Sequence, residues 1–257
     1  MLAALQRKEK GFLYLETHSG RGAYDLAHSA AEAEGGVARF SATANNSAEL
    51  QRYAAHLAEY RTQQGNSHAY PGSPLLAARE LRPQDRAVLV ELMPAEAHTL
   101  ELAIADNPRI RVETGDGFER LRAWLPPSER RGLTFIDPPY EETNQDFERV
   151  TTAVIEALRR FRTGIVAAWY PIKDEREIAA WQLELARHLD CETLVAELWL
   201  YPRDSRIALN GSGLLIVNPP YLLAERMRVW LPELQAQLDV AGQVGGTSIR
   251  SLPGMPR

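Results

Sequence analysis

Short apolar runs alternate with segments of helical periodicity along most of this 257-residue chain. Runs rich in branched and aromatic residues are typical of buried β-strands. Seven such runs lie at residues 12–18, 87–93, 109–114, 132–137, 164–170, 193–201 and 213–218. Between them, helical periodicity is found at residues 95–105, 118–125, 147–161 and 175–189. The third of these segments places apolar side chains on one face, as a helix packed on a sheet requires: Val150, Val154, Ala157, Leu158 and Phe161.

This alternation predicts an α/β fold with a doubly wound, mainly parallel sheet of seven strands that is covered by helices on both sides. The last two predicted strands are joined by "PRDSRIALNGS" without a helix. A parallel connection needs a longer crossover, so we expect the last strand to run antiparallel.

The interval 28–70 interrupts the alternation, because it contains no strand candidate. Its segment "SAELQRYAAHLAEYRTQQ" predicts a helix with one apolar face: Leu50, Tyr53, Ala54, Leu57 and Tyr60. We therefore expect one domain over residues 1–257 with a helical insertion subdomain at 28–70. The fold resumes at "YPGSP", where Ser73 is expected as a helix N-cap and Pro74 as the first helical residue.

The two ends of the chain show weaker patterns. "MLAALQRKEK" is typical of the second half of a longer amphipathic helix, so we expect the chain to be a shortened version or to begin upstream. The tail "GGTSIRSLPGMPR" is expected to be a loose end. No internal repeat is visible.

Composition narrows the class of protein. Hydrophobic residues make up 45% and charged residues 25%, the usual balance of a folded soluble protein. No apolar run approaches the roughly 18 residues of a membrane span, and no secretory signal is present, so we expect a cytoplasmic protein without a membrane partner. The single cysteine, Cys191, excludes an internal disulfide and a multi-cysteine zinc site, and is predicted to be a buried small hydrophobe. The sequence does not specify an oligomeric state, and a monomer is the simplest assumption.

The net charge of -5 requires any nucleic-acid partner to meet a local basic face. Solvated surface charge is the more common explanation for any one arginine cluster. Three clusters that adjoin predicted strands are candidates for such a face: Arg130 with Arg131; Arg159, Arg160 and Arg162; and Arg203 with Arg206.

Candidate ligand-binding residues stand where the first three parallel strands end. Ligands of such sheets bind beyond the carboxyl ends of the strands. Gly20 and Gly22 in "ETHSGRGAY" would let the backbone approach a ligand, although glycines at such turns are as common for packing. Glu91 has the position of a carboxylate that accepts from ribose hydroxyls, and Asp116 with Gly117 could bind an exocyclic amine or make a turn. A full GxGxxG is absent, which disfavours a nicotinamide dehydrogenase.

The fourth strand ends in "DPPY", Asp137 to Tyr140. With Asp or Asn first and any aromatic last, this tetrapeptide arises by chance in roughly one protein of this size in a few hundred. An adenine amine is a poor nucleophile because its lone pair is delocalised into the ring. The Asp137 carboxylate and a carbonyl held by Pro138 and Pro139 could accept its two N–H hydrogens, and Tyr140 could stack on an extruded base. The alternative is an acid followed by a rigid turn.

A second copy, "NPPY", begins at Asn218. If its strand runs antiparallel, Asn218 lies at the edge of the sheet opposite to Gly20, Glu91 and Asp116. We therefore assign the chemistry to Asp137 and interpret Asn218 as a strand terminator.

Together, "FLYLETHSGRGAY", "YPGSP", "VELMP", "GDGF", "RRGLTFIDPPYE", "WYPI" and "VNPPY" resemble the RlmJ (YhiR) family of S-adenosylmethionine-dependent N6-adenine methyltransferases. The likeness runs from about residue 5 to about residue 250. It implies a Rossmann-like methyltransferase fold, S-adenosylmethionine as cofactor and an adenine of 23S ribosomal RNA, free or partly assembled, as substrate. It also implies that His18, Ser73, Glu91, Asp116 and Gly117 contact the cofactor and that Asp137 is the catalytic acceptor. The family's N-terminal "YRHxxHAGNxADVxKH"-like pattern is absent, which agrees with the expectation of a shortened chain.

Two other functions stay open at this point. DNA adenine methyltransferases share the DPPY signature, so DNA is an alternative substrate. A catalytically silent RNA-binding or ribosome-assembly module is the other, given the missing segment. Metal hydrolysis is disfavoured because the six histidines have no ligand spacing.

Overall fold

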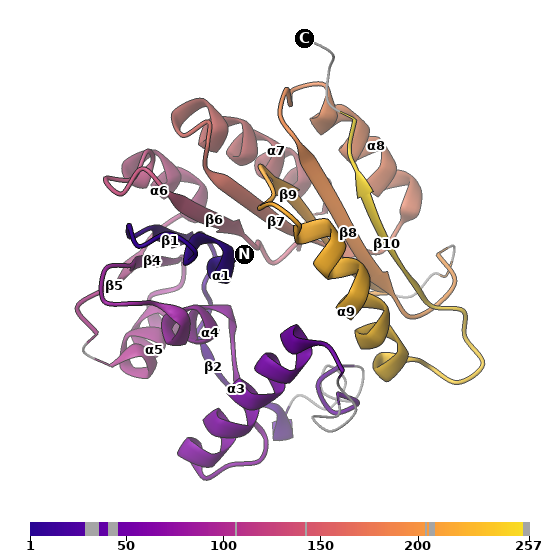
Figure 1. The fold of residues 1–257 in the computed structure, drawn as a ribbon, viewed down its shortest axis with the longest axis horizontal. Helices are drawn as coiled ribbons and strands as arrows, with labels where there is room; N and C mark the ends of the chain where they lie inside the picture. Colours follow the sequence, from indigo (N-terminus) through magenta and orange to yellow (C-terminus); the bar gives the residue numbers. More distant parts are fainter. Residues whose placement is uncertain are drawn as a thin grey trace.

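The computed structural model describes residues 1–28, 36–40, 46–105, 107–141, 143–203, 205 and 209–253. In these residues, eight strands form one sheet in the order β10-β8-β9-β7-β6-β1-β4-β5 (Figure 1). Its strands are β1 (Leu13–Glu16), β4 (Arg86–Glu91), β5 (Ile110–Thr114), β6 (Gly132–Ile136), β7 (Ile165–Ile172), β8 (Thr193–Trp199), β9 (Gly211–Val217) and β10 (Gly246–Ser251). The α/β class and the seven predicted strands are confirmed.

Strand directions follow the expected pattern. The pairs β1–β4, β1–β6, β4–β5 and β6–β7 are parallel, and β9 runs antiparallel to both β7 and β8. The prediction of a loose tail was wrong, because β10 pairs antiparallel with β8 over residues 246–251. The segment "GTSIRS" has few apolar residues, and it is the free edge of β8 that supplies its hydrogen-bond partners.

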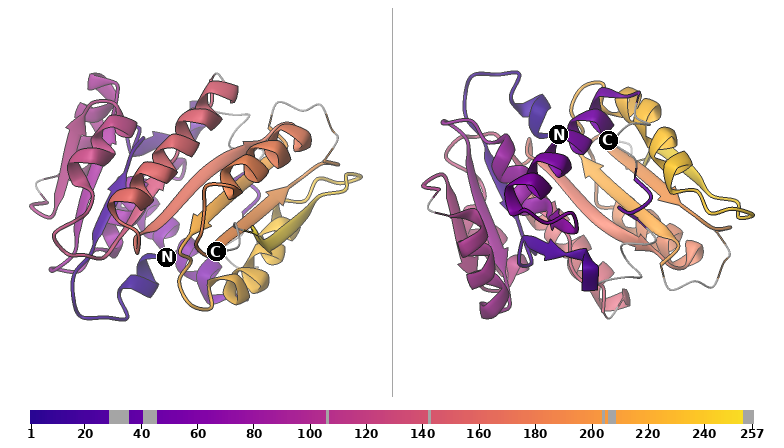
Figure 2. Two further views of the ribbon diagram at one scale, coloured as in Figure 1. Left: turned by 90° about the horizontal axis from the view of Figure 1, so that it is seen from above. Right: turned by 90° about the horizontal axis from the view of Figure 1, so that it is seen from below.

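Helices cover both faces of the sheet (Figure 2). On one face α6 (Gly117–Trp124), α7 (Thr143–Arg160) and α8 (Glu175–Ala186) bury their apolar sides, including the face predicted for α7. On the other face lie α1 (Leu2–Leu5), α4 (Ser73–Glu80), α5 (Pro94–Ile104) and α9 (Leu223–Leu238). None of the helices in the described residues is both long and apolar enough to span a bilayer.

The predicted insertion lies partly outside the described residues. Its helix α3 (Ala48–Gln64) buries Leu50, Ala54 and Leu57 and lies away from the large sheet, with its first turn against α9 (Figure 1). The interval 28–70 also contains the start of β3 (Ala69–Pro71), which pairs with β2 (Ala23–Asp25) in a small second sheet; the one-turn η1 (Leu26–His28) follows β2. The prediction that the interval 28–70 contains no strand was therefore wrong at the C-terminal end of the interval. A separate helical subdomain stays a prediction.

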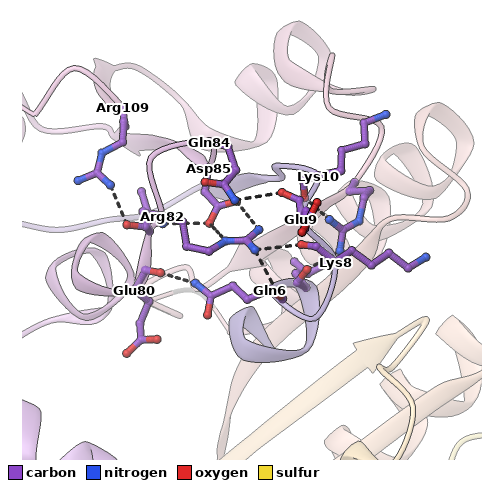
Figure 3. Close-up of polar contacts among 12 residues, drawn as sticks. Gln6, Lys8, Glu9, Lys10, Glu80, Arg82, Gln84, Asp85 and Arg109 are labelled. Carbon is purple, nitrogen blue, oxygen red and sulfur yellow. Dashed lines mark hydrogen bonds and ion pairs between the residues drawn. The ribbon is translucent and has the colours of Figure 1, made fainter.

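The segment before β1 is only briefly helical, since α1 ends at Leu5. After α1, side chains of the α4–β4 connection donate hydrogen bonds to the main-chain carbonyl groups of residues 6–9 (Figure 3). Arg82 donates to the carbonyls of Gln6 and Lys8 at 3.1 and 2.9 Å, and Gln84 donates to that of Glu9 at 3.0 Å. This segment is tied to the edge of the sheet at the amino ends of β1 and β4.

Candidate active site

The turn after β1 is attached to the end of β4 by a carboxylate. Glu91, the last residue of β4, accepts hydrogen bonds from the main-chain N–H groups of Gly20 and Met93, both at 2.8 Å. Gly20 and Gly22 adopt φ values of 60° and 71°, a region that favours glycine. Both carboxylate oxygens keep a lone pair for a further donor. The structure thus brings Gly20 and Glu91 together at the carboxyl edge, as predicted.

His18 and Asp116 line one cavity of about 330 Å³ at the same edge. The His18 ring meets Phe118 edge to face at 4.7 Å between centroids, and its Nδ1 lies 2.7 Å from Thr17 Oγ1. Burial lowers the pKa of His18 to about 4. The negative charge of Asp116 raises this pKa, and the positive charge of Arg149 lowers it further. The imidazole is therefore neutral at physiological pH.

Asp116 begins helix α6. Its Oδ1 accepts from the N–H of Phe118 at 2.8 Å, and its Oδ2 pairs with Arg149 at 2.7 Å. Arg149 also covers the Phe118 ring, with its guanidinium carbon 4.5 Å from the centroid. A Cβ on Gly117 would lie 1.8 Å from the carbonyl oxygen of Thr17, so only glycine permits this approach of α6 to the β1 turn. Arg149 is a cavity residue that sequence reasoning missed, because α7 brings it from far along the chain.

Asp137 follows β6, which lies beside β1. Burial raises the pKa of its carboxyl group to about 7. No hydrogen bond or ion pair joins this carboxyl group to another described residue, which leaves it available to a ligand. Pro138 and Pro139 line the cavity with His18 and Asp116. The predicted position of the DPPY turn at the shared edge is therefore observed.

Tyr140 occupies a tighter environment. Its ring is 2% exposed, packs against Phe147 and Trp169, and its hydroxyl donates to the Trp169 carbonyl at 2.6 Å. Its φ of 53° is unusual for a non-glycine residue, and Lys173 donates to its carbonyl at 3.3 Å. These contacts fix the turn, and the stacking of Tyr140 on a base stays a prediction.

The sequence predicted Ser73 as the N-cap of α4, and this prediction was wrong. The N-cap is Gly72, Ser73 is the first helical residue, and Pro74 follows it. The Ser73 hydroxyl instead donates to Oε1 of Glu16, the last residue of β1. Because this partner is remote in sequence, no local pattern could reveal that it competes with the cap.

Glu16 is the second residue that sequence reasoning missed. It is fully buried, and its Oε2 accepts from the hydroxyl of Tyr14 at 2.9 Å. Burial raises its pKa to about 8, the hydrogen bonds from Ser73 and Tyr14 oppose this, and the charge of Asp137 adds to it. A glutamate in an otherwise apolar strand is the signal that could have found it.

The edge thus combines a neutral histidine, carboxylates at the ends of neighbouring parallel strands, and a DPPY turn. A family model described as "Ribosomal RNA large subunit methyltransferase D, RlmJ" matches residues 9–250. The chain is 38% identical over 246 residues to ribosomal RNA large subunit methyltransferase J of Escherichia coli K12, a match that spans 94% of this chain and 87% of the relative. This chain belongs to the RlmJ family.

Two further comparisons agree with this membership. The RlmJ relative named ribosomal RNA large subunit methyltransferase J in Haemophilus influenzae is 36% identical over the same shares of both chains. A crystal structure of a Legionella pneumophila protein is 34% identical, with a TM-score of 0.86 that covers 97% of this chain and 92% of the other. The methyltransferase fold expected from the motifs is therefore confirmed for this RlmJ family member.

The second motif copy lies at the opposite edge of the RlmJ fold. Because Val217 pairs with Val166, Asn218 stands beside the start of β7. Its amide donates to the carbonyls of Arg162 and Gly164, both at 2.8 Å. Asn218 ends β9, as predicted, and lies far from the end of β6 that carries Asp137.

The structure gives partners for several arginines of the predicted clusters, and a basic face formed by these clusters stays a prediction. Arg159 and Arg160 pair with Glu156, and Arg162 with Asp190. Arg131 donates to the carbonyls of Leu5 and Lys10, at the amino end of the strands. Arg203 pairs with the buried Glu197, and Arg206 lies outside the described residues.

Cys191 is half-buried against the core rather than fully buried, and burial raises the pKa of its thiol. No group of three metal-ligating side chains converges in the part of the chain that the structure describes.

Proposed function

We propose that this chain transfers a methyl group from S-adenosylmethionine to the exocyclic N6 of an adenine in 23S ribosomal RNA. The observation that carries the proposal is the position of Asp137 beyond β6, directly beside the β1 end that carries His18 and Gly20, with Glu91 at the end of β4 on the other side of β1. Family membership supports ribosomal RNA as the substrate. Bacterial ribosomal RNA is found in the cytoplasm, which is where we expect the protein to act, as a monomer.

The residues at the edge fit a nucleoside cofactor. Glu91 presents free carboxylate lone pairs at the position suited to ribose hydroxyls, and Asp116 and Gly117 open a cavity beside the apolar Leu92 and Phe118. The hydroxyl of Ser19 is buried without a hydrogen-bond partner among the described residues, as expected where a ligand supplies one. We assign His18, Gly20, Ser73, Glu91, Asp116 and Gly117 to cofactor binding.

When bound, S-adenosylmethionine supplies an electrophilic methyl group on a sulfonium. The protein's task is to make the adenine amine nucleophilic. In its ionised form, Asp137 accepts one N–H of that amine, and the carbonyl of Pro138 accepts the other, which stabilises positive charge as the nitrogen becomes tetrahedral. Tyr140 is assigned to the adenine side of the site. Since ionisation of Asp137 is required, kcat/KM for S-adenosylmethionine, which reports on the ligand-free protein, should rise with pH through about 7.

Transfer of a labelled methyl group tests the proposal. Free 23S ribosomal RNA, assembled large subunits and genomic DNA, each from cells that lack the enzyme, are incubated with the protein and methyl-labelled S-adenosylmethionine. We expect N6-methyladenosine in the free RNA. Transfer to DNA alone would contradict RNA as the substrate. Tight RNA binding without cofactor binding in calorimetry would instead indicate a silent RNA-binding module.

A further inference from the structure

Two carboxyl groups lie on one face of the sheet, at the ends of adjacent strands. Glu16 of β1 pairs in register with Phe135 of β6, and Asp137 stands two residues beyond Phe135. Side chains two apart on a strand point to the same face, so Glu16 and Asp137 lie on one face at the ends of adjacent strands. Glu16 is fully buried, and Asp137 is partly buried, enough to raise the pKa of its carboxyl group.

No cation neutralises this pair. The partners of Glu16 are hydroxyl groups, namely Tyr14 on its own strand and Ser73 on α4. Tyr24 of β2 is a further titratable group whose ionisation Glu16 influences. Neither Glu16 nor Asp137 forms an ion pair with any residue in the described ranges. Two uncompensated negative charges at adjacent strand ends repel each other, so one of the two groups retains its proton to a higher pH.

The two carboxyl groups differ in which ionises first. Burial raises the pKa of Asp137 to about 7, whereas burial and the charge of Asp137 together raise that of Glu16 to about 8. Glu16 is also fully buried whereas Asp137 is only partly buried, so desolvation disfavours the charge of Glu16 more strongly and Asp137 ionises while Glu16 is still neutral. The hydroxyl groups of Tyr14 and Ser73 can accept a hydrogen bond from a carboxylic acid as well as donate one to a carboxylate, so both forms of Glu16 are satisfied.

We propose that Glu16 and Asp137 form a coupled pair in which Glu16 is the positioning residue: it holds one proton so that Asp137 carries the negative charge, and it releases that proton when a cationic ligand enters the site. The first part concerns the ligand-free protein alone. The second part rests on the proposed function, because S-adenosylmethionine carries a sulfonium charge that stabilises both carboxylates and lowers their pKa values.

Carboxyl titration of the ligand-free protein tests the pair. In protein labelled with carbon-13 at aspartate and glutamate carboxyl groups, Glu16→Gln and Asp137→Asn assign the two resonances, and exposed Glu101→Gln is the control. We expect Asp137 to titrate near pH 7 and Glu16 near pH 8, with a lower Glu16 pKa in Asp137→Asn. Titration of either group below pH ~5, as for an ordinary carboxyl group, would overturn the pair. So would a Glu16 pKa that Asp137→Asn leaves unchanged. If Glu16→Gln does not fold, comparison of the wild type with Asp137→Asn still tests whether the two groups are coupled.

Calorimetry in buffers of different ionisation enthalpy tests proton release. At pH 7.5, S-adenosylmethionine should release protons from the wild type, and fewer from Glu16→Gln. S-adenosylhomocysteine, which lacks the sulfonium charge, should release fewer from the wild type. Equal release in all three cases would refute the linkage. If NMR shows coupled titration of Glu16 and Asp137 but calorimetry shows no cofactor binding, the proposed function is contradicted and the coupled pair is supported.

Discussion

The main-chain N–H of Gly20 donates to Oε2 of Glu91 across 71 residues of sequence, and this 2.8 Å bond joins the β1 turn to the end of β4. In Glu91→Ala, the N–H groups of Gly20 and Met93 lose their hydrogen-bond acceptor. The hydroxyl groups of a bound ribose lose theirs as well. We expect the dissociation constant for S-adenosylmethionine to rise about 10- to 100-fold, which corresponds to roughly 1.4 to 2.8 kcal/mol. Calorimetry measures it. Glu96→Ala, which breaks only an exposed ion pair with Arg21, is the control and should change affinity less than about threefold. Equal losses in both variants would argue against Glu91 as a ligand.

Asp137→Asn keeps the shape of the side chain and removes its negative charge. We expect kcat for methyl transfer to fall at least about 100-fold, with cofactor affinity within a few-fold of the wild type. Asn218→Ala changes the first residue of the twin motif and is the matched control. It removes two hydrogen bonds to Arg162 and Gly164, so it should lower stability by about 1–3 kcal/mol while kcat is preserved. Activity in Asp137→Asn above a tenth of the wild-type value would remove Asp137 from its role.

Glu16 and Asp137 should make the ligand-free protein less stable as the pH rises from ~4.5 to ~8. Glu16 and Asp137 have folded-state pKa values of about 8 and about 7, both raised above the unfolded values. In this window the folded state binds more protons than the unfolded state, so the free energy of unfolding falls as pH rises. Urea unfolding at pH 5.5 and 8.5 measures this change. Glu16→Gln should reduce it by an amount on the order of 2 kcal/mol. An identical pH dependence in wild type and variant would contradict the raised pKa.

His18 should stay neutral well below pH 6. Burial lowers its pKa to about 4, against an ordinary value near 6.5. Its imidazole resonances should therefore be constant from pH 5.5 to 8. Because the unfolded chain binds a proton that the folded site refuses, this group favours unfolding as pH falls from about 6.5 toward 4. NMR in protein with labelled histidine measures these resonances, and titration of His18 near pH 6.5 would refute its burial.

Gly117→Ala should destabilise the fold and the cofactor site together. The added methyl group would lie 1.8 Å from the Thr17 carbonyl oxygen, which is backbone and can yield only if α6 moves. We expect a loss of about 2 kcal/mol or more in the free energy of unfolding and weaker binding of S-adenosylmethionine. Ala123→Gly, at an exposed position of the same helix, is the control for helix propensity and should cost about 1 kcal/mol. Wild-type stability in Gly117→Ala would contradict the close approach.

By itself, the sequence determined the alternation of strands and helices, because apolar periodicity reports directly which side chains must leave water. It also located Gly20, Glu91, Asp116 and Asp137 at the ends of parallel strands, since strand order along the chain and a common direction place those ends at one edge. The antiparallel course of β9, and with it the exclusion of Asn218, followed from the short connection before that strand.

Only the tertiary structure decided what depends on partners remote in sequence. "GTSIRS" becomes β10 because β8 offers an unpaired edge, and Ser73 leaves the N-cap role because Glu16 accepts its hydroxyl. Arg149 enters the cavity because α7 packs beside α6. The ionisation of Glu16 and Asp137 depends on burial and on each other's charge, and neither quantity exists until β1 and β6 lie side by side.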